Sequence, residues 1–336
     1  MNQADSVQEQ VKGYYGKRLK KSEDLQTNVT CSLTRPPSSK TVREAMTLIH
    51  PEVSQRYFGC GLVVPESLEG CHVLDLGSGS GRDCYVLSKL VGPLGHVTGV
   101  DMTDEQIQLS RKYVPYHQEK FGYKEANTEF VQGYIEKLGE AGIPYNSFDL
   151  LISNCVICLC PDKKAVFEEA YRILKEGGEV YFSDMYASEP VNEELKKDVV
   201  LWGDVQYASG TYRFFKLPAV KSKSKCLVTY KGTVTDHEQE LHFDSAHIFK
   251  KDKAVEVDGE LAMVLKTSRF ASHFDIQINE EEKEPLKDGY QQYCHLNPFL
   301  LADKLGSSIQ KCSKAQKGSL CKNQEEEKKE STVVEG

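Results

Sequence analysis

The sequence predicts an α/β fold built on a parallel, doubly wound sheet. Between residues 72 and 188, short apolar runs alternate with segments of helical periodicity, which indicates a parallel sheet with helices on both faces. A second observation is the run DLGSGSGRD at 75–83, where three glycines at alternate positions connect a buried strand to a helix. Such a loop brings a ligand against bare backbone at the N-terminus of the helix.

The elements follow from periodicity and from turn residues. Polar segments with apolar residues at helical spacing predict helices within 1–27 and at 41–53. Pro115 should kink or shorten the long helix in which it lies. In the central region we expect strands at 72–76, 96–100, 128–135, 148–153 and 179–185, and helices near 82–91, 104–120, 136–142 and 162–175.

The glycine-rich run indicates which ligand binds. Its spacing, D-x-G-x-G-x-G, is one residue tighter than the dinucleotide fingerprint and has carboxylates on both sides, which favours an ammonium group over a pyrophosphate. A nucleoside that carries an amino acid fits, so S-adenosylmethionine is favoured over NAD; a tight turn with a capping aspartate is the alternative. The expected cofactor residues lie at strand ends: Asp75, Gly77, Gly79, Gly81, Asp101, Met102, Ile135, Glu136 and Asn154.

Three of these residues have specific expected roles. Asp101 ends the second strand, where a carboxylate accepts both ribose hydroxyls. Ile135 and Glu136 follow the third strand, where they would pack on adenine and accept its amino group, although an ordinary strand end is an equal alternative.

Composition limits the class of protein. The 336 residues are 39% apolar and 27% charged, with a formal net charge of −8, which argues against nucleic acid or an anionic membrane as a partner. No apolar run approaches the roughly 20 residues that span a bilayer, and no secretory signal is visible. Eleven cysteines in such a chain predict reduced thiols in the cytoplasm. We expect a monomer.

The positions of three cysteines in the sequence indicate possible roles for their thiols. Cys155 follows the fourth strand directly after Asn154, close to where the methyl group of S-adenosylmethionine would point. Cys158 completes a C-x-x-C pair, but no second pair stands at zinc spacing, so a closed zinc site is not expected. Cys60 lies between two glycines on an accessible turn, although a lone cysteine is more often a small apolar filler.

Several motifs together resemble the arsenite methyltransferases of animals. They are DLGSGSGRD at 75–83, YFGCG at 57–61, GYIEKLG at 133–139, SNCVI at 153–157, and YFSD at 181–184 with WG at 202–203. The likeness runs from about residue 8 to about residue 276, apart from one gap. It implies a Rossmann-like class I methyltransferase that transfers methyl groups from S-adenosylmethionine to trivalent arsenic, as arsenite or methylarsenicals.

The resemblance also implies roles for three cysteines. In the family, thiolates hold arsenic, and Cys60 and Cys155 match two of these ligands. Cys31 and Cys60 match a pair that forms a disulfide while returning oxidised arsenic to the trivalent state. Thioredoxin or glutathione would then reduce that disulfide by thiol–disulfide exchange.

The sequence departs from the family after Gly203. The family continues through a glycine-rich segment with a further arsenic-binding cysteine, whereas here 204–210 leads almost directly into 211–216, which resembles the last strand of the sheet. No cysteine lies between Cys160 and Cys226, and the sheet would lose an edge strand. We expect this form to bind S-adenosylmethionine weakly or normally but to methylate arsenic poorly. Cys158 is a weaker candidate for the missing ligand.

The remaining sequence predicts a small C-terminal lobe. Strands are expected at 226–230, 240–243 and 246–250, and a helix at 259–265. From about 279 the composition becomes polar and charged, which indicates a disordered tail. The expected organisation is N-terminal helices and thiol loops at 1–70, a cofactor domain at 71–216, an α+β lobe at 217–278 and the tail at 279–336.

Two other functions remain compatible with these patterns. One is a form that binds S-adenosylmethionine, and also arsenic, without catalysis. The other is a methyltransferase for a different small molecule, which would use the same loop but would not need three separated cysteines. Replacement of Cys155 distinguishes an arsenic methyltransferase from the second of these alternatives, since in an arsenic methyltransferase it should abolish arsenic binding and spare cofactor binding.

Overall fold

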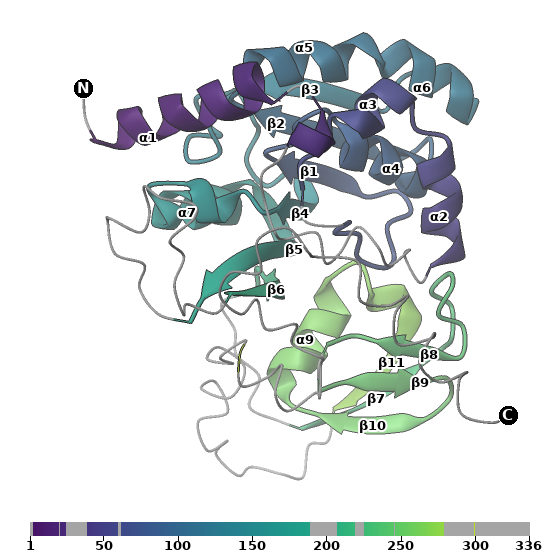
Figure 1. Cartoon of the computed structure of the whole chain (residues 1–336). Helices are drawn as coiled ribbons and strands as arrows, with labels where there is room; N and C mark the ends of the chain where they lie inside the picture. The colour runs from purple at the N-terminus through teal and green to yellow at the C-terminus, as the bar shows by residue number, and fades with distance from the viewer. Residues whose placement is uncertain are drawn as a thin grey trace, which may run out of the picture. The chain divides into compact units, whose positions relative to one another are not determined.

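Figure 1 shows the computed structural model, which describes residues 3–19, 21–24, 39–59, 62–188, 207–218, 225–244, 246–278 and 299. Cys31, Cys60, the expected shortening near 203–206 and the expected tail beyond 278 (apart from Phe299) lie outside these residues. The described residues within 1–184 and 210–289 belong to one compact unit, which contains the C-terminal lobe and the sheet except for residues 185–187 and 207–209 of its last two strands. The described part of the chain contains no helix long and apolar enough to cross a bilayer.

A six-stranded sheet forms the centre of this unit. Its order is β3-β2-β1-β4-β5-β6, and the neighbours from β3 to β5 pair in parallel. The order reverses between β1 and β4, and ligands of doubly wound folds bind outside the carboxyl ends of the strands at such a reversal. The strands are β1 (His72–Leu76), β2 (His96–Asp101), β3 (Thr128–Gln132), β4 (Phe148–Asn154), β5 (Leu174–Ala187) and β6 (Tyr207–Phe215).

Both faces of the sheet are buried, because successive side chains of the central strands enter different hydrophobic clusters. Val73 packs with helices α2, α4, α5 and α6, whereas Leu74 packs with helix α7. Leu150 and Leu151 divide in the same way. The helices of the first cluster lie together in Figure 1. Their bounds are α2 (Lys40–Thr47), α4 (Arg82–Val91), α5 (Asp104–Lys112) and α6 (Val114–Phe121), and α7 is Lys163–Ile173.

Prolines divide two helices that the periodicity joined. The expected helix at 104–120 is divided: α5 ends at Lys112, and Pro115 lies in the first turn of α6, where its missing N–H costs nothing. The expected helix at 41–53 is likewise α2 followed by α3 (Pro51–Gln55), which Pro51 begins. At the N-terminus, α1 (Gln3–Lys12) continues into a wider π-helical turn.

The expected helix at 136–142 is wrong, and the third strand is shorter than expected. Residues 133–144 form successive turns, and the strand ends at Gln132. Gly133 donates its N–H to the carbonyl of Asp101, and Gly139 donates to the carboxylate of Glu169 on α7, at 3.0 and 2.8 Å. Within the segment, most bonds join residues three apart, as from the N–H of Lys137 to the carbonyl of Tyr134 and from that of Gly142 to Gly139, so turns form in place of a helix.

The C-terminal lobe has its own core. A three-stranded sheet of order β10-β7-β11 and the hairpin β8-β9 enclose it with helix α9. Strands β10 and β11 were not expected, whereas the other elements were. The bounds are β7 (Cys226–Tyr230), β8 (Glu240–His242), β9 (Ile248–Lys250), β10 (Ala254–Val257), α9 (Gly259–Thr267) and β11 (Phe274–Ile278).

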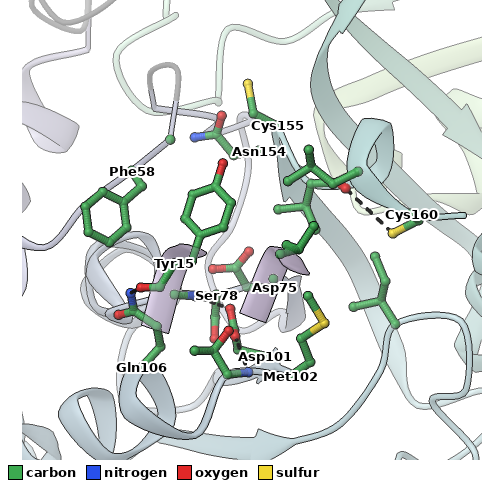
Figure 2. Close-up of a pocket in the computed structure, with 18 of the residues that line it drawn as sticks. Tyr15, Phe58, Asp75, Ser78, Asp101, Met102, Gln106, Asn154, Cys155 and Cys160 are labelled. Carbon is green, nitrogen blue, oxygen red and sulfur yellow. Dashed lines mark hydrogen bonds between the residues drawn. The ribbon is translucent and has the colours of Figure 1, made fainter. Parts of the chain in front are cut away.

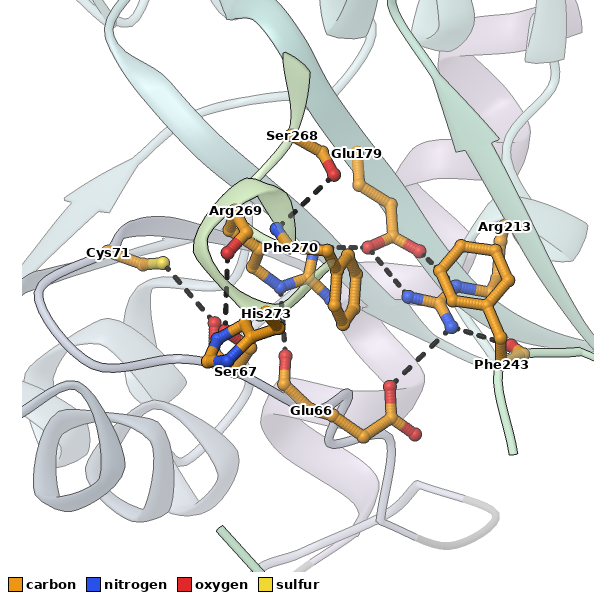
Figure 3. Close-up of polar contacts among 10 residues, drawn as sticks. All are labelled: Glu66, Ser67, Cys71, Glu179, Arg213, Phe243, Ser268, Arg269, Phe270 and His273. Carbon is orange, nitrogen blue, oxygen red and sulfur yellow. Dashed lines mark hydrogen bonds and ion pairs between the residues drawn. The ribbon is translucent and has the colours of Figure 1, made fainter. Parts of the chain in front are cut away.

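A buried ion-pair cluster joins the lobe to the central sheet (Figure 3). Glu179 of β5 has a fully buried side chain and binds Arg213 of β6, with Nε 2.5 Å from Oε1. Arg269, which follows α9, binds the other carboxylate oxygen of Glu179. The two guanidinium groups hold the pKa of Glu179 below its ordinary value despite its burial.

Candidate functional site

A cavity opens at the carboxyl ends of β1, β2 and β4, where the strand order reverses (Figure 2). It has about 1000 Å³ of empty space, part of which is open to solvent. Eight of the nine expected cofactor residues line it: Asp75, Gly77, Gly79, Asp101, Met102, Ile135, Glu136 and Asn154. Gly81 is not among the lining residues. It caps the N-terminus of α4 with φ +82°, and a Cβ there would lie 2.7 Å from the ring of Phe130.

The glycine-rich loop is held open by backbone bonds to β2. The N–H groups of Gly77 and Ser78 donate to the carbonyl of Val100, and that of Gly79 donates to Asp101 Oδ2 at 2.9 Å. Gly79 has φ +53°, and a Cβ built there would meet no atom of the described residues within 4 Å. The loop therefore offers bare backbone to the cavity.

Three carboxylates gather at this loop. Burial and the charge of Asp83 raise the pKa of Asp75 to about 8. Burial also raises the pKa of Asp101, although the N–H groups of Thr103 and Gly79 oppose this shift. Asp83 binds the guanidinium of Arg82 at 2.7 Å. Two of these acidic groups thus have a raised pKa, and an ammonium group would favour their ionised forms, whereas a pyrophosphate would oppose them.

Polar atoms at the cavity lack partners within the described residues. Ser78 Oγ and Gln106 Oε1 are buried without a hydrogen bond, on the side of the cavity where Asp101 lies (Figure 2). Gln106 donates its amide to the carbonyl of Tyr15 at 3.3 Å. Buried polar groups are rarely left unsatisfied, so these atoms fit a polar ligand such as a nucleoside.

Sequence reasoning missed the residues that the N-terminal helices bring to the cavity. Gln8 donates to Glu136 Oε1 at 3.2 Å, and Tyr15 packs on Phe58 with ring centroids 5.9 Å apart. Gln106 has a readable signal, because it lies in the first turn of the helix that follows Asp101. The residues of α1 have none, because only the tertiary fold brings them to the sheet.

Cys155 is the half-buried thiol at this cavity. It follows β4 with φ +57°, and its N–H donates to the carbonyl of Ser183 at 2.8 Å. A left-handed conformation is uncommon for a side chain of this kind and is typical of functional positions. Four other described thiols, those of Cys71, Cys84, Cys160 and Cys226, are buried, and burial raises the pKa of each.

Cys158 is half-buried but does not line the cavity. Its N–H donates to Asp184 Oδ2 at 2.9 Å, which fixes the turn after Cys155. Within the described part of the chain, no three His, Cys, Asp or Glu side chains are arranged to hold a metal ion.

Tyr57 connects the segment before Cys60 with the end of β4. Its ring lies under the guanidinium of Arg82, 3.1 Å from the centroid, and its hydroxyl accepts a hydrogen bond from Asn154. Gly59 also approaches Asn154, since a Cβ at Gly59 would lie 2.8 Å from the amide nitrogen. Residues 57–59 therefore lie beside the residue that precedes Cys155.

The fold and the cavity define a class I methyltransferase that uses S-adenosylmethionine. The family described as "Methyltransferase domain" matches residues 67–240, and the family described as "Arsenite methyltransferase C-terminal domain" matches residues 223–327. The human arsenite methyltransferase is 44% identical, over 94% of this chain and 96% of its own. That of Aquipseudomonas alcaligenes is 40% identical, over 80% and 90%. The chain therefore belongs to the arsenite methyltransferase family.

A solved structure agrees with this assignment. The arsenic(III) S-adenosylmethionine methyltransferase of Chlamydomonas reinhardtii has a TM-score of 0.69 and 34% identity, and the match covers 74% of this chain and 99% of that one. The alignment with the human relative spans 363 positions, which is more than the 336 residues of this chain. Some positions of that alignment therefore have no residue here.

Proposed function

We propose that the chain transfers methyl groups from S-adenosylmethionine to trivalent arsenic, as arsenite or methylarsenicals, held by cysteine thiolates. The observation that carries this proposal is the half-buried thiol of Cys155 beside a cavity lined by Asp75, Asp101 and the glycine-rich loop. A methyl acceptor bound to this thiol would lie beside the cofactor cavity. Membership of the arsenite methyltransferase family supports the choice of acceptor.

Different residues of the cavity bind different parts of the cofactor. Asp75 binds the ammonium group, and Asp101 accepts hydrogen bonds from the ribose hydroxyls. Ile135 packs on the adenine, and Glu136 accepts a hydrogen bond from its amino group. Met102 and Asn154 complete the walls, and the backbone of Gly77 and Gly79 lies against the ligand, while Gly81 sets the direction of α4. When bound, S-adenosylmethionine supplies an electrophilic methyl group on a sulfonium, so the protein needs to position the reactants and little acid–base chemistry is required.

Thiolates are suited to the acceptor. Arsenic(III) is a soft centre that prefers thiolate ligands, and Cys155 together with Cys60 supplies them. Thiols would displace hydroxyl groups from arsenite as water, and the arsenic lone pair would then form a bond to the methyl carbon as the carbon–sulfur bond of the sulfonium breaks and S-adenosylhomocysteine leaves. The methylated arsenic would be formally pentavalent, and oxidation of the Cys31 and Cys60 thiols to a disulfide would supply the two electrons that return it to the trivalent state. Thioredoxin or glutathione reduces this disulfide, which suits a monomeric protein in the reducing cytoplasm.

We further propose that this form methylates arsenic slowly. The segment after Gly203 lacks the additional cysteine expected of the family, so Cys60 and Cys155 must hold arsenic with one thiolate fewer. Cys158 does not line the cavity, which argues against its replacing the missing ligand. The alternative that this argument favours is a form that binds S-adenosylmethionine and arsenic without turnover.

The test is incubation of the purified chain with arsenite, labelled S-adenosylmethionine, glutathione and thioredoxin. Methylated arsenic that disappears in Cys155→Ser, with cofactor binding retained, supports the proposal. Cofactor and arsenite binding without product supports the non-catalytic form. Cofactor binding without any arsenite binding contradicts the proposal and favours a different acceptor. Cys226→Ser, in the core of the C-terminal lobe, is the control for loss of a buried thiol.

A further inference from the structure

Cys84 contacts the carboxylate that the cofactor proposal assigns to the ammonium group. It lies in the first turn of α4, and its side chain is fully buried. Its thiol donates to Asp75 Oδ2, with sulfur and oxygen 3.1 Å apart. Within the described residues, no other donor is found on the side chain of Asp75. The mechanism proposed above makes no use of this cysteine.

The thiol keeps its proton in this position. Burial and the neighbouring charge of Asp75 raise the pKa of Cys84 well above its ordinary value. A protonated, fully buried thiol is a poor ligand for arsenic and a poor nucleophile, but it remains a hydrogen-bond donor. Cys84 is therefore suited to act on Asp75 and not on arsenic.

Asp75 needs such a donor. It is 4% exposed, and the charged groups that face it are Asp83 and Arg82 of α4 and Asp101 of β2. Arg82 is paired with Asp83 at 2.7 Å, and its charge only partly offsets the effect of burial and of the two other carboxylates on Asp75. A hydrogen bond to an ionised acceptor in a buried place is stronger than one in water, even from a weak donor.

We propose that Cys84 is a positioning residue for the methyl donor, because its thiol orients the Asp75 carboxylate and supports its ionised form when the ammonium group arrives. This inference rests on the proposed role of Asp75 in cofactor binding. Cys84 would then serve cofactor binding and would take no part in binding or reducing arsenic.

Cofactor binding without arsenic provides the test. Dissociation constants of S-adenosylmethionine and S-adenosylhomocysteine are measured by calorimetry between about pH 6 and pH 9.5, since both ligands carry the ammonium group. We expect Cys84→Ala to weaken the binding of both ligands by roughly three- to tenfold near pH 7.5. The pH at which binding reaches half its maximum should also shift to a higher value. Cys84→Ser, which retains a donor, should stay close to the wild type in its pH profile.

Two further measurements distinguish a role of Cys84 in positioning Asp75 from a role in core packing alone. In an Asp75→Asn background, Cys84→Ala should have no additional effect, because the two substitutions act through one contact. Cys71→Ala is the matched control, since Cys71 is another buried thiol, just before the opposite end of β1. Equal losses in Cys84→Ala and Cys84→Ser with an unchanged pH profile, or full additivity with Asp75→Asn, would overturn the proposal.

The wild-type protein gives an independent readout if Cys84→Ala does not fold. The infrared S–H stretching band of a hydrogen-bonded thiol lies at lower frequency than that of a free thiol, and loss of the band in Cys84→Ser assigns it. We expect this band to shift when S-adenosylmethionine binds and when Asp75 is replaced by asparagine. A band that moves in neither case contradicts the contact. Because no arsenic is present, these results do not depend on whether arsenic is the acceptor.

Discussion

The side-chain amide of Asn154 donates a hydrogen bond of 2.5 Å to the hydroxyl of Tyr57, which ties the end of β4 to residues 57–59. The same amide lies 3.3 Å from Asp83 Oδ2, so the contact also reaches the cofactor loop. Asn154 precedes Cys155, and residues 57–59 precede Cys60. One hydrogen bond thus connects the two chain segments that carry the proposed arsenic ligands.

Tyr57→Phe should therefore impair turnover more than cofactor binding. The phenyl ring keeps its place under Arg82 but loses the bond to Asn154, so the two thiol segments are less well positioned. We expect kcat/KM for arsenite to fall by about tenfold, while the Kd of S-adenosylmethionine changes by less than about threefold. Steady-state kinetics and calorimetry on the same preparation check this. An equal loss of both quantities would place Tyr57 with the cofactor instead.

Asp75→Asn should stabilise the ligand-free protein at neutral to alkaline pH. The pKa of Asp75 is about 8 in the folded chain against about 3.9 when exposed, so between these values the folded chain holds a proton that the unfolded chain has released. Stability from this group therefore falls as pH rises through that window. We expect the variant to melt several degrees above the wild type at pH 8 and close to it at pH 4.

The same substitution should weaken the binding of S-adenosylmethionine, because an amide carries no negative charge to pair with the ammonium group. Stability and affinity thus change in opposite directions, which is typical of a functional group held in an unfavourable place. Calorimetric melting without ligand, followed by titration with ligand, measures both. A variant less stable than the wild type at pH 8 would show that Asp75 is ionised and satisfied in the free protein.

His117 should make the protein sensitive to mild acid. It is 1% exposed and stacked on Tyr85, with ring centroids 3.6 Å apart. The backbone N–H of His50 donates to its Nε2, and the carbonyl of Tyr113 lies 2.8 Å from Nδ1, so Nδ1 carries the proton of the neutral ring. Burial lowers the pKa of His117 to about 4.

The neutral form of His117 therefore contributes fully to the free energy of unfolding above about pH 6.5. This contribution is lost as pH falls toward 4, because the unfolded chain binds the proton at a higher pH than the folded chain does. We expect a loss of about 2 kcal/mol from this group over that range. His117→Gln should be less stable at pH 7 and should lose less stability on acidification. Urea unfolding at pH 7, 5.5 and 4.5 checks this, and an unchanged slope in the variant would contradict it.

Much of the cofactor cavity was predictable from sequence because its residues follow strands. Asp75 and Asp101 end two adjacent parallel strands, and the carboxyl ends of such strands meet at one edge of the sheet. Ile135 also reaches the cavity, although its strand ends at Gln132. At these positions, the local sequence pattern and the order of the strands are sufficient to predict which residues line the cavity.

Other parts of the cavity depend on contacts that no local pattern reveals. Tyr15 comes from the N-terminal segment, and Tyr57 is placed by its contacts with Arg82 and Asn154. Cys84 appears in the sequence as one more apolar helix residue, and only its distance to Asp75 shows a polar role. The expected helix at 136–142 is replaced by successive turns, whose bonds join residues three apart and which end at Gly142 with φ +81°.

Glu179→Gln should strongly destabilise the protein, because it leaves the guanidinium group of Arg269 buried with a neutral partner and that of Arg213 with only the carboxylate of Glu66, 3.5 Å away. Their side chains are 11% and 6% exposed, and that of Glu179 is fully buried. Removing one member of a buried ion pair costs about 3–5 kcal/mol. We therefore expect the melting temperature to fall by about 10 °C and to depend little on added salt.

A matched exposed pair tests whether burial is the cause. Lys164 and Glu168 lie one turn apart on α7 at 3.0 Å, with side chains 85% and 57% exposed. Glu168→Gln should cost less than about 0.5 kcal/mol, since water screens such pairs. If Glu179→Gln cost no more than Glu168→Gln, the two arginines would have found water or another acceptor, and the cluster would not hold the C-terminal lobe on the sheet. A large cost for Glu179→Gln alone, reduced when Arg269→Met removes the orphaned charge, would show that the cluster holds the lobe through its buried charges.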